Sequence, residues 1–150
     1  MFRLGAGVLS ETPAAAVEAA ATPAARAYGR ARLLSSLPAA TTAGQLALPR
    51  DRLTAIGLSP NELVARGATL ELRALLDDVA EEAHAALAAA RRELARLPPV
   101  VTPAFLPLAL VEPYLRALKE VRGDPLRTAV DITPLRRIWQ LWRGHRRGRL

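Results

Sequence analysis

Residues 28–58 read YGRARLLSSLPAATTAGQLALPRDRLTAIGL, and this stretch decides how the chain is interpreted. It opens inside a helix for which Thr22 and Pro23 form a good N-cap and first-turn pair, and Pro38 is expected to end that helix. Residues 44–49 alternate in polarity and close on a proline, which predicts a short extended connector instead of a paired strand. The stretch therefore predicts helices joined by a non-helical segment.

Proline and glycine positions on either side of this stretch divide the rest of the chain into further helices. Residues 70–97 repeat Leu, Val and Ala at three- and four-residue steps, which predicts a long amphipathic helix. A short helix is expected at 59–67, where Gly67 ends it. Another is expected at 102–121, with a kink or break at Pro107 and Pro113. The last helix is expected to begin at Thr133 and Pro134 and to end at Gly144.

The composition favours an all-α fold. Of 150 residues, 51% are hydrophobic, Ala and Leu dominate, and β-branched residues are sparse. The length suits one domain, which we expect over 1–143, followed by a basic disordered tail at 144–150. The absence of cysteine excludes disulfides, thiolate zinc sites and cysteine nucleophiles.

The positive charge is concentrated at the C-terminus. The net charge is +7, and the six arginines of residues 136–150 account for all but about +1 of it. An anionic partner is therefore expected at this end of the chain. No apolar run reaches the roughly 18–20 residues that cross a bilayer. We expect a cytoplasmic protein, with a peripheral position at the inner membrane as the alternative.

Acidic residues at 77–82 are the only candidates for a metal site in the sequence. Asp77 and Glu81, or Asp78 and Glu82, would lie one helical turn apart. However, magnesium diphosphate sites take carboxylates from two facing helices together with Lys or Arg. We therefore favour a solvated helix face. No Ser-His-Asp order or phosphate-binding glycine loop is present, and His84 has no second histidine nearby.

The last helix carries the strongest positive signal for binding. Leu135, Ile138, Trp139 and Trp142 are expected on one face, with Arg136, Gln140 and Arg143 on the other. Such a helix can bind an anionic membrane surface or pack its apolar face on the helical body. Contact with nucleic acid is the third alternative, which we disfavour because that function needs a broader basic surface than one tail. The residues of the candidate membrane site are Arg136, Arg137, Trp139, Trp142, Arg143, Arg146 and Arg147.

The segment Gly44-Gln45-Leu46-Ala47-Leu48-Pro49 resembles the Gly-Arg-x-Tyr-Leu-Pro segment of the squalene/phytoene synthase family. The likeness continues through the long helix, the proline-rich run 101–107 with Pro113-Tyr114-Leu115, and the closing 139–143. It corresponds to the C-terminal part of the family's domain. The resemblance implies a partial isoprenoid-synthase-type helical bundle of about six helices.

Departures from the family pattern imply a lost activity. Family enzymes condense two prenyl diphosphates with magnesium held by two aspartate-rich motifs. Laid on Gly44 and Pro49 without a gap, the second motif falls on Ser36 and Ala40, neither of which can hold a metal ion. The chain is similar to a non-catalytic branch associated with assembly of respiratory complex I. We therefore expect no cofactor, no catalytic residue, and a binding or assembly scaffold near a membrane.

Two alternatives remain open. The chain is half of a prenyltransferase if a partner protein supplies the missing N-terminal helices and an aspartate motif, and only then is Mg²⁺ expected as cofactor. A decayed fragment that does not fold is the other reading, which a cooperative thermal melt would exclude.

Overall fold

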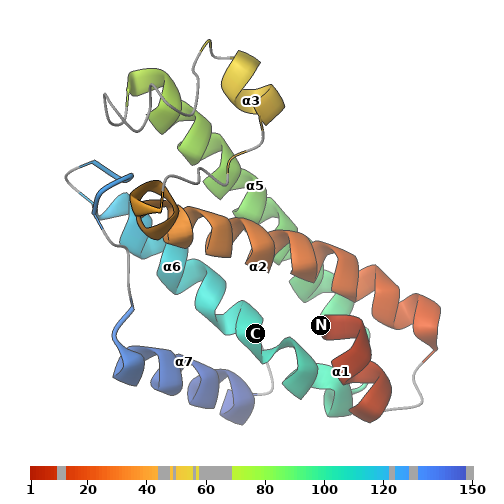
Figure 1. The fold of residues 1–150 in the computed structure, drawn as a ribbon. Helices are drawn as coiled ribbons and strands as arrows, with labels where there is room; N and C mark the ends of the chain where they lie inside the picture. The colour runs from red at the N-terminus through yellow and green to blue at the C-terminus, as the bar shows by residue number, and fades with distance from the viewer. Residues whose placement is uncertain are drawn as a thin grey trace.

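The computed structural model describes residues 1–9, 13–43, 48, 50–55, 57, 69–121, 124–128 and 132–147. These residues form six α-helices and one 3₁₀ helix and contain no strand, which confirms an all-α bundle of about six helices (Figure 1). The elements are α1 (Phe2–Leu9), α2 (Ala14–Thr42), α3 (Arg50–Ala55), α5 (Leu70–Leu94), the 3₁₀ helix η1 (Pro99–Leu110), α6 (Val111–Lys119) and α7 (Pro134–Arg147). The expected connector at 44–49 lies outside the described residues except for the buried Leu48, and the expected helix at 59–67 lies outside them entirely.

The centre of the fold is the pair α2 and α5, which run side by side over most of their length (Figure 1). Small side chains make this possible, because an alanine surface lets two helices approach closely. The alanines buried on α2 are Ala20, Ala21, Ala24, Ala27 and Ala31, and those on α5 are Ala80, Ala83 and Ala90. Leu34 and Leu37 of α2 and Leu76 and Leu87 of α5 are buried in the same core.

Helix α2 continues through both of its prolines, so the predictions that it begins at Pro23 and ends at Pro38 are wrong. A proline inside a helix costs about 3 kcal/mol because it removes one hydrogen bond and crowds a carbonyl. Packing offsets this cost, since Ala21 and Ala24 are buried on either side of Pro23, and Leu37 and Pro38 are themselves buried. The Thr41 and Thr42 hydroxyls also donate to the carbonyls of Leu37 and Pro38 and close the last turn.

Helix α5 confirms the amphipathic helix expected over residues 70–97. It begins where the Thr69 hydroxyl accepts a hydrogen bond from the Leu72 backbone N–H at 3.2 Å, which is the role of an N-cap residue. It ends at Leu94, three residues before the expected boundary.

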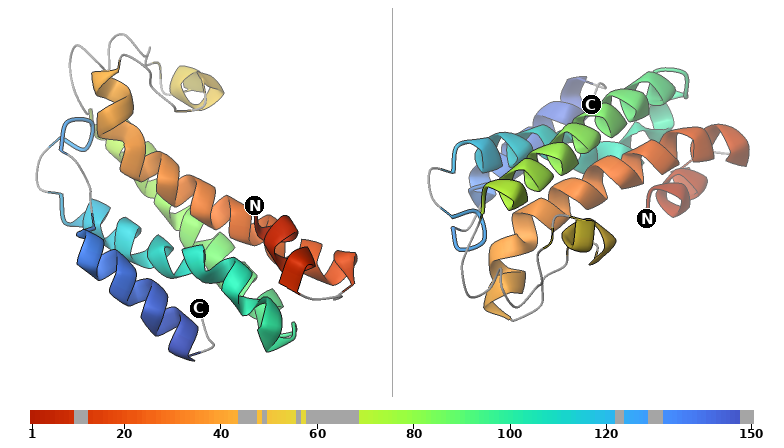
Figure 2. Two further views of the ribbon diagram at one scale, coloured as in Figure 1. Left: turned by 60° about the horizontal axis from the view of Figure 1, so that its bottom comes forward. Right: turned by 90° about the horizontal axis from the view of Figure 1, so that it is seen from above.

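The 3₁₀ helix η1 covers twelve residues, although runs longer than about four are uncommon. Pro99, Pro103 and Pro107 recur at four-residue steps, and each ring disfavours the α-helical hydrogen bond at its position. The segment begins at Pro99, before the expected start at Thr102. Its buried Phe105 stacks on Phe2 of α1 with ring centroids 5.3 Å apart. Figure 2 shows α1 and α7 on either side of the segment formed by η1 and α6.

Helix α7 extends to Arg147, so the prediction that it ends at Gly144 is wrong. Gly144 is buried and does not take the positive φ of a terminating glycine. Residues 148–150 lie outside the described residues.

Candidate functional site

Ser36 and Ala40, the positions that the motif resemblance assigns to aspartates, lie one turn apart on α2 and are half-buried. The Ser36 hydroxyl donates to the Leu33 carbonyl of its own helix at 2.9 Å. Ala40 has no polar atom in its side chain. A divalent cation needs several oxygen ligands, preferably carboxylates, and these two side chains supply none that carries a charge.

The acidic residues of 77–82 do not act as a group. The carboxylate of Glu82 accepts hydrogen bonds from Arg30 of α2 and Arg52 of α3, each at 2.8 Å. Glu81 pairs with Lys119 of α6 at 3.4 Å, while Asp77 and Asp78 are exposed. Among the described residues, no cluster of three or more Asp, Glu, His or Cys side chains could hold a metal ion.

Glu82 therefore joins three helices. The hydrogen bond from Arg52 is the largest cause that holds the pKa of Glu82 below its ordinary value, and Arg30 lowers the pKa further, while burial acts in the opposite direction. Sequence reasoning missed this contact, because Arg30 and Arg52 lie 52 and 30 residues away from Glu82 and no local pattern connects them.

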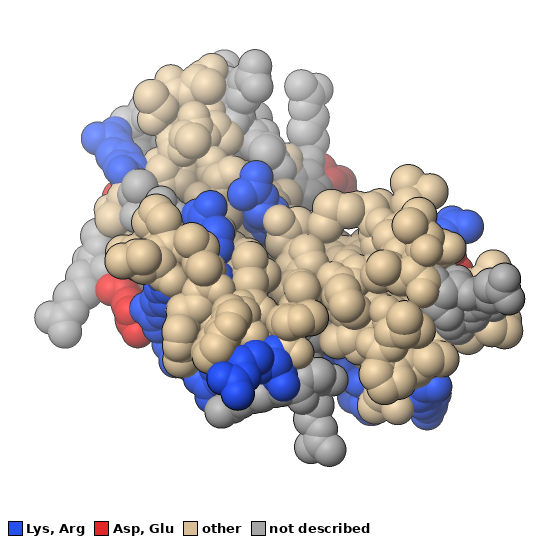
Figure 3. Space-filling model, turned by 90° about the horizontal axis from the view of Figure 1, so that it is seen from below, with Lys and Arg blue, Asp and Glu red and all other residues tan. Residues whose placement is uncertain are grey.

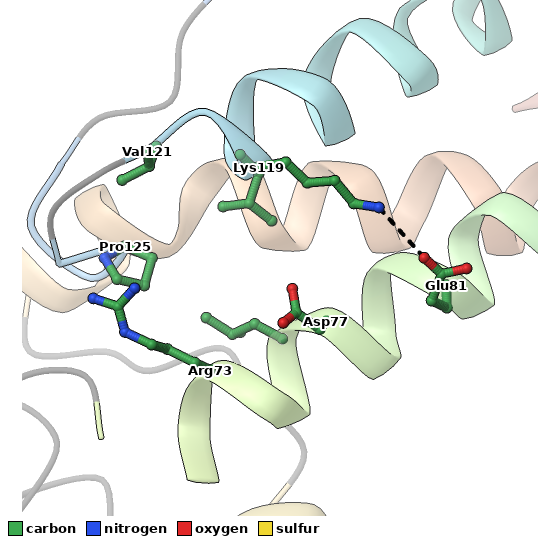
Figure 4. A pocket seen from close by; sticks show the side chains of 8 residues that line it. Arg73, Asp77, Glu81, Lys119, Val121 and Pro125 are labelled. Carbon is green, nitrogen blue, oxygen red and sulfur yellow. Dashed lines mark hydrogen bonds and ion pairs between the residues drawn. The ribbon is translucent and has the colours of Figure 1, made fainter. Parts of the chain in front are cut away.

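A hollow of about 530 Å³ lies between α5, the end of α6 and the turn at 124–128 (Figure 4). The charged residues that line it are Arg73, Asp77, Glu81 and Lys119, so positive and negative side chains are equal in number. Figure 4 shows Lys119 reaching across to Glu81. A site that selects a diphosphate has an excess of positive charge or carboxylates placed to hold metal ions. Among the described residues that line this hollow, the positive and negative charges balance, and its two carboxylates belong to no group of three or more side chains that could hold a metal ion.

Helix α7 turns its apolar face away from the body. Trp139 and Trp142 are 48% and 52% exposed, and Leu135 and Ile138 are still more exposed. The alternative in which Leu135, Ile138 and Trp139 pack on the helical body is therefore wrong.

The face of α7 that contacts the body is instead formed by Arg137, Leu141 and Gly144, which follow each other at four- and three-residue steps. Leu141 packs against the core, and α7 as a whole lies against η1. Sequence reasoning missed this face because one leucine and one glycine form too weak a stripe beside two tryptophans.

Two arginines accompany the tryptophans on the outer face. The Arg143 guanidinium lies 5.0 Å from the centre of the Trp139 ring, and the Arg146 guanidinium lies 4.9 Å from the Trp142 ring. These are cation–π contacts between residues one turn apart. The expectation that Arg143 lies opposite the tryptophans is therefore wrong, because it shares their side of the helix.

The remaining residues of the candidate membrane site differ in position. Arg136 is exposed, Arg137 is half-buried toward the body, and the side chain of Arg147 lies outside the described part of the structure. No Asp or Glu occurs in residues 132–150. Figure 3 shows this side of the molecule as a broad uncharged surface bordered by Lys and Arg, with little acidic surface visible. None of the described helices is both long and apolar enough to span a bilayer.

Comparison with known proteins agrees with the helical architecture. The family model for squalene/phytoene synthase matches residues 1–141. Among curated proteins, the chain is similar to NADH dehydrogenase (ubiquinone) complex I, assembly factor 6 of Rattus norvegicus, with 29% identity over 122 residues, and to the Mus musculus protein of the same name, with 28%. Each alignment covers 79% of this chain but only 37% of the relative. No solved structure matches the chain.

Proposed function

Since the chain belongs to the squalene/phytoene synthase family, we propose that it is a non-catalytic member that acts as a binding or assembly scaffold at an anionic membrane surface. The observation that carries the proposal is the outer face of α7, where Trp139, Trp142 and Ile138 are exposed beside arginines. Exposed tryptophan costs solvation free energy in water and is favoured at the boundary between lipid headgroups and acyl chains.

The loss of catalysis is supported by α2. The aspartate motif of the family pattern falls on Ser36 and Ala40, which carry no carboxylate, and Arg30 and Arg52 are paired with Glu82. Incubation of the chain with magnesium and farnesyl or geranylgeranyl diphosphate should therefore give no condensed product. Turnover by the single chain would refute this part of the proposal.

Peripheral binding by α7 combines two contributions. The apolar side chains insert at the interface, and the arginines meet lipid phosphates, each contributing about 1 kcal/mol near an anionic surface. The Trp139 and Trp142 rings hold Arg143 and Arg146 on the lipid-facing side, so both contributions act at the same place. Because Leu141 and Gly144 fix α7 to the body, this face is already formed before it meets the membrane.

Vesicle co-sedimentation tests the proposal. The chain should bind vesicles of phosphatidylcholine that contain about a third phosphatidylglycerol and should bind pure phosphatidylcholine weakly. Arg143→Gln with Arg146→Gln should weaken binding by about 2 kcal/mol, or ~30-fold. Trp139→Ala with Trp142→Ala should weaken it on both kinds of vesicle.

A charge-matched control is available on the other helices. Arg26 of α2 and Arg92 of α5 are exposed, so Arg26→Gln with Arg92→Gln removes the same charge without altering α7. Equal loss of binding in this control and in the α7 variant would mean that only the net charge matters, and the assignment of the membrane site to α7 would fail.

A further inference from the structure

The 3₁₀ helix η1 presents an apolar row to the outside of the molecule. In a 3₁₀ helix, residues three positions apart lie above one another, so η1 has three rows. One row contains no buried residue, and its members are Val100, Pro103, Leu106 and Ala109. Val100 and Pro103 are exposed, and the other two are half-buried. Residues 97–111 contain no charged side chain, so η1 lacks the polar face that a helix ordinarily turns to water.

Helix α1 extends this surface on one side. It approaches η1 so closely that a Cβ atom added at Gly5 would lie 3.1 Å from the Cβ atom of Ala104. Leu4 and Val8, on the side of α1 away from the buried Phe2, are 77% and 87% exposed. An exposed aliphatic stripe of α1 therefore accompanies the apolar row of η1.

Helix α7 borders η1 on the other side. Figure 1 shows α1, η1 and α7 as the lower layer of the molecule. The left view of Figure 2, in which this layer comes forward, shows all three in front of α5. Figure 3, seen from below, shows a broad uncharged surface with Lys and Arg at its border. The helix that carries the tryptophans thus lies on the same side of the molecule as η1 and α1.

Contact with a lipid bilayer accounts for these features together. Contiguous exposed apolar surface marks a binding site for a protein or a membrane. Here α7 adds tryptophans with stacked arginines, which are favoured where anionic headgroups meet acyl chains. A bilayer is wide enough to contact α1, η1 and α7 at once. Pro103 has no N–H group, so its row can leave water with one donor fewer to satisfy.

We infer that η1 and α1 rest on the same membrane surface as α7, so that this whole layer lies against the bilayer. The side chains that enter the interface beside the tryptophans are Leu4, Val8, Val100 and Pro103. The inference rests on the proposed membrane binding and adds an orientation to it. Contact through α7 alone leaves the body free to tilt, whereas contact through three elements holds the layer parallel to the surface.

Fluorescence can separate α7 from the other two elements. The chain contains no cysteine, and its two tryptophans, Trp139 and Trp142, both lie on α7. Tryptophan emission therefore reports on α7, while a nitrobenzoxadiazole label on a single introduced cysteine reports on another position. Vesicles of phosphatidylcholine with about a third phosphatidylglycerol should shift the tryptophan emission, and the label emission of Val100→Cys and of Leu4→Cys, to shorter wavelength. Leu70→Cys is the matched control, because the exposed Leu70 begins α5, whose first turn lies at the opposite end of the molecule (Figure 1).

Val100→Gln with Leu4→Gln measures how much these side chains contribute to affinity. The double variant should bind the same vesicles at least about tenfold more weakly, because two apolar side chains that enter the interface become polar. Leu70→Gln should leave the affinity unchanged. Both substituted side chains are more than half exposed, so the double variant should keep its melting temperature.

A shift of the tryptophan emission without a shift of the labels at Val100 and Leu4 would overturn the inference and leave membrane binding by α7 standing. Unchanged emission of tryptophans and labels alike would refute both. Label shifts that appear without vesicles as the concentration of the chain rises would assign the surface to a second copy. An equal shift at Leu70 would mean that the bound chain has no fixed orientation. Either of these last two results would also overturn the inference.

Discussion

Replacement of Glu82 by Gln should destabilise the fold by about 1 kcal/mol at neutral pH, because the contacts with Arg30 and Arg52 lose their charge. The three side chains are each about one-third exposed, so each pair contributes about 0.5–1 kcal/mol and not the 3–5 kcal/mol of a fully buried pair. The amide keeps one acceptor oxygen and retains part of this energy. For a chain of this size, a loss of about 1 kcal/mol lowers the melting temperature by about 2–4 °C.

Thermal unfolding followed by far-ultraviolet circular dichroism measures this loss, and Glu81→Gln is the matched control. Glu81 is more exposed and its contact with Lys119 is longer, 3.4 Å against 2.8 Å, so its loss should be below about 0.5 kcal/mol. An equal or larger effect of Glu81→Gln would refute the assignment of Glu82 as the residue that joins α2, α3 and α5.

The pH dependence of the same variant provides a second check. The pKa of Glu82 is lower in the folded chain than its ordinary value, chiefly through Arg52. A carboxyl group of this kind stabilises the fold above its unfolded pKa, and the contribution disappears as the pH falls through the folded pKa. The difference between the natural chain and Glu82→Gln should therefore shrink as the pH falls below the ordinary carboxyl pKa and through the lower folded pKa. A constant difference across this range would contradict the ion-pair explanation.

Three further predictions concern packing and salt. Leu87→Ala should lower the free energy of unfolding in urea by about 2–5 kcal/mol, because Leu87 is fully buried on α5. Gly29→Ala should raise the melting temperature, since Gly29 lies inside α2 and an added Cβ meets nothing within 4 Å. Gly144→Leu should lower the melting temperature, because Gly144 is buried and a leucine side chain there would push α7 away from its neighbours. Vesicle binding should weaken as salt rises from about 0.05 M to 0.5 M, and less so in Arg143→Gln with Arg146→Gln; salt-independent binding would contradict a contribution from arginine.

The sequence predicts the type of fold better than the ends of its helices. The periodic pattern of α5 and the cap at Thr69 depend on neighbours within one or two turns, so they can be read directly. The course of α2 through Pro23 and Pro38 depends on packing against α5, residues that come much later in the chain. Local rules predict breaks at both prolines because they do not include that packing energy.

In the candidate site, too, some features depend on nearby residues and can be predicted, while others depend on packing against distant parts of the chain and cannot. An amphipathic α7 with tryptophans on one face can be predicted from its own residues, but the side that faces the body cannot. The tryptophan side of α7 is the more apolar, which favours packing that side on the body, but in the structure the side with Leu141 and the buried Gly144 faces the body. Hydrophobicity alone therefore predicts the orientation of this helix wrongly.

The partners of Arg30 and Arg52 bear on the proposal that the chain is non-catalytic. In a diphosphate site, Lys and Arg must remain available for phosphate oxygens when the substrate is absent. Here Arg30 and Arg52 hold a carboxylate of the protein itself at 2.8 Å, and that carboxylate, Glu82, lies on the neighbouring helix. A substrate would have to compete with an intramolecular partner for both guanidinium groups, without metal ligands to assist it at Ser36 and Ala40. Two arginines of the segment that carries the family likeness, Arg30 and Arg52, therefore take part in contacts between helices.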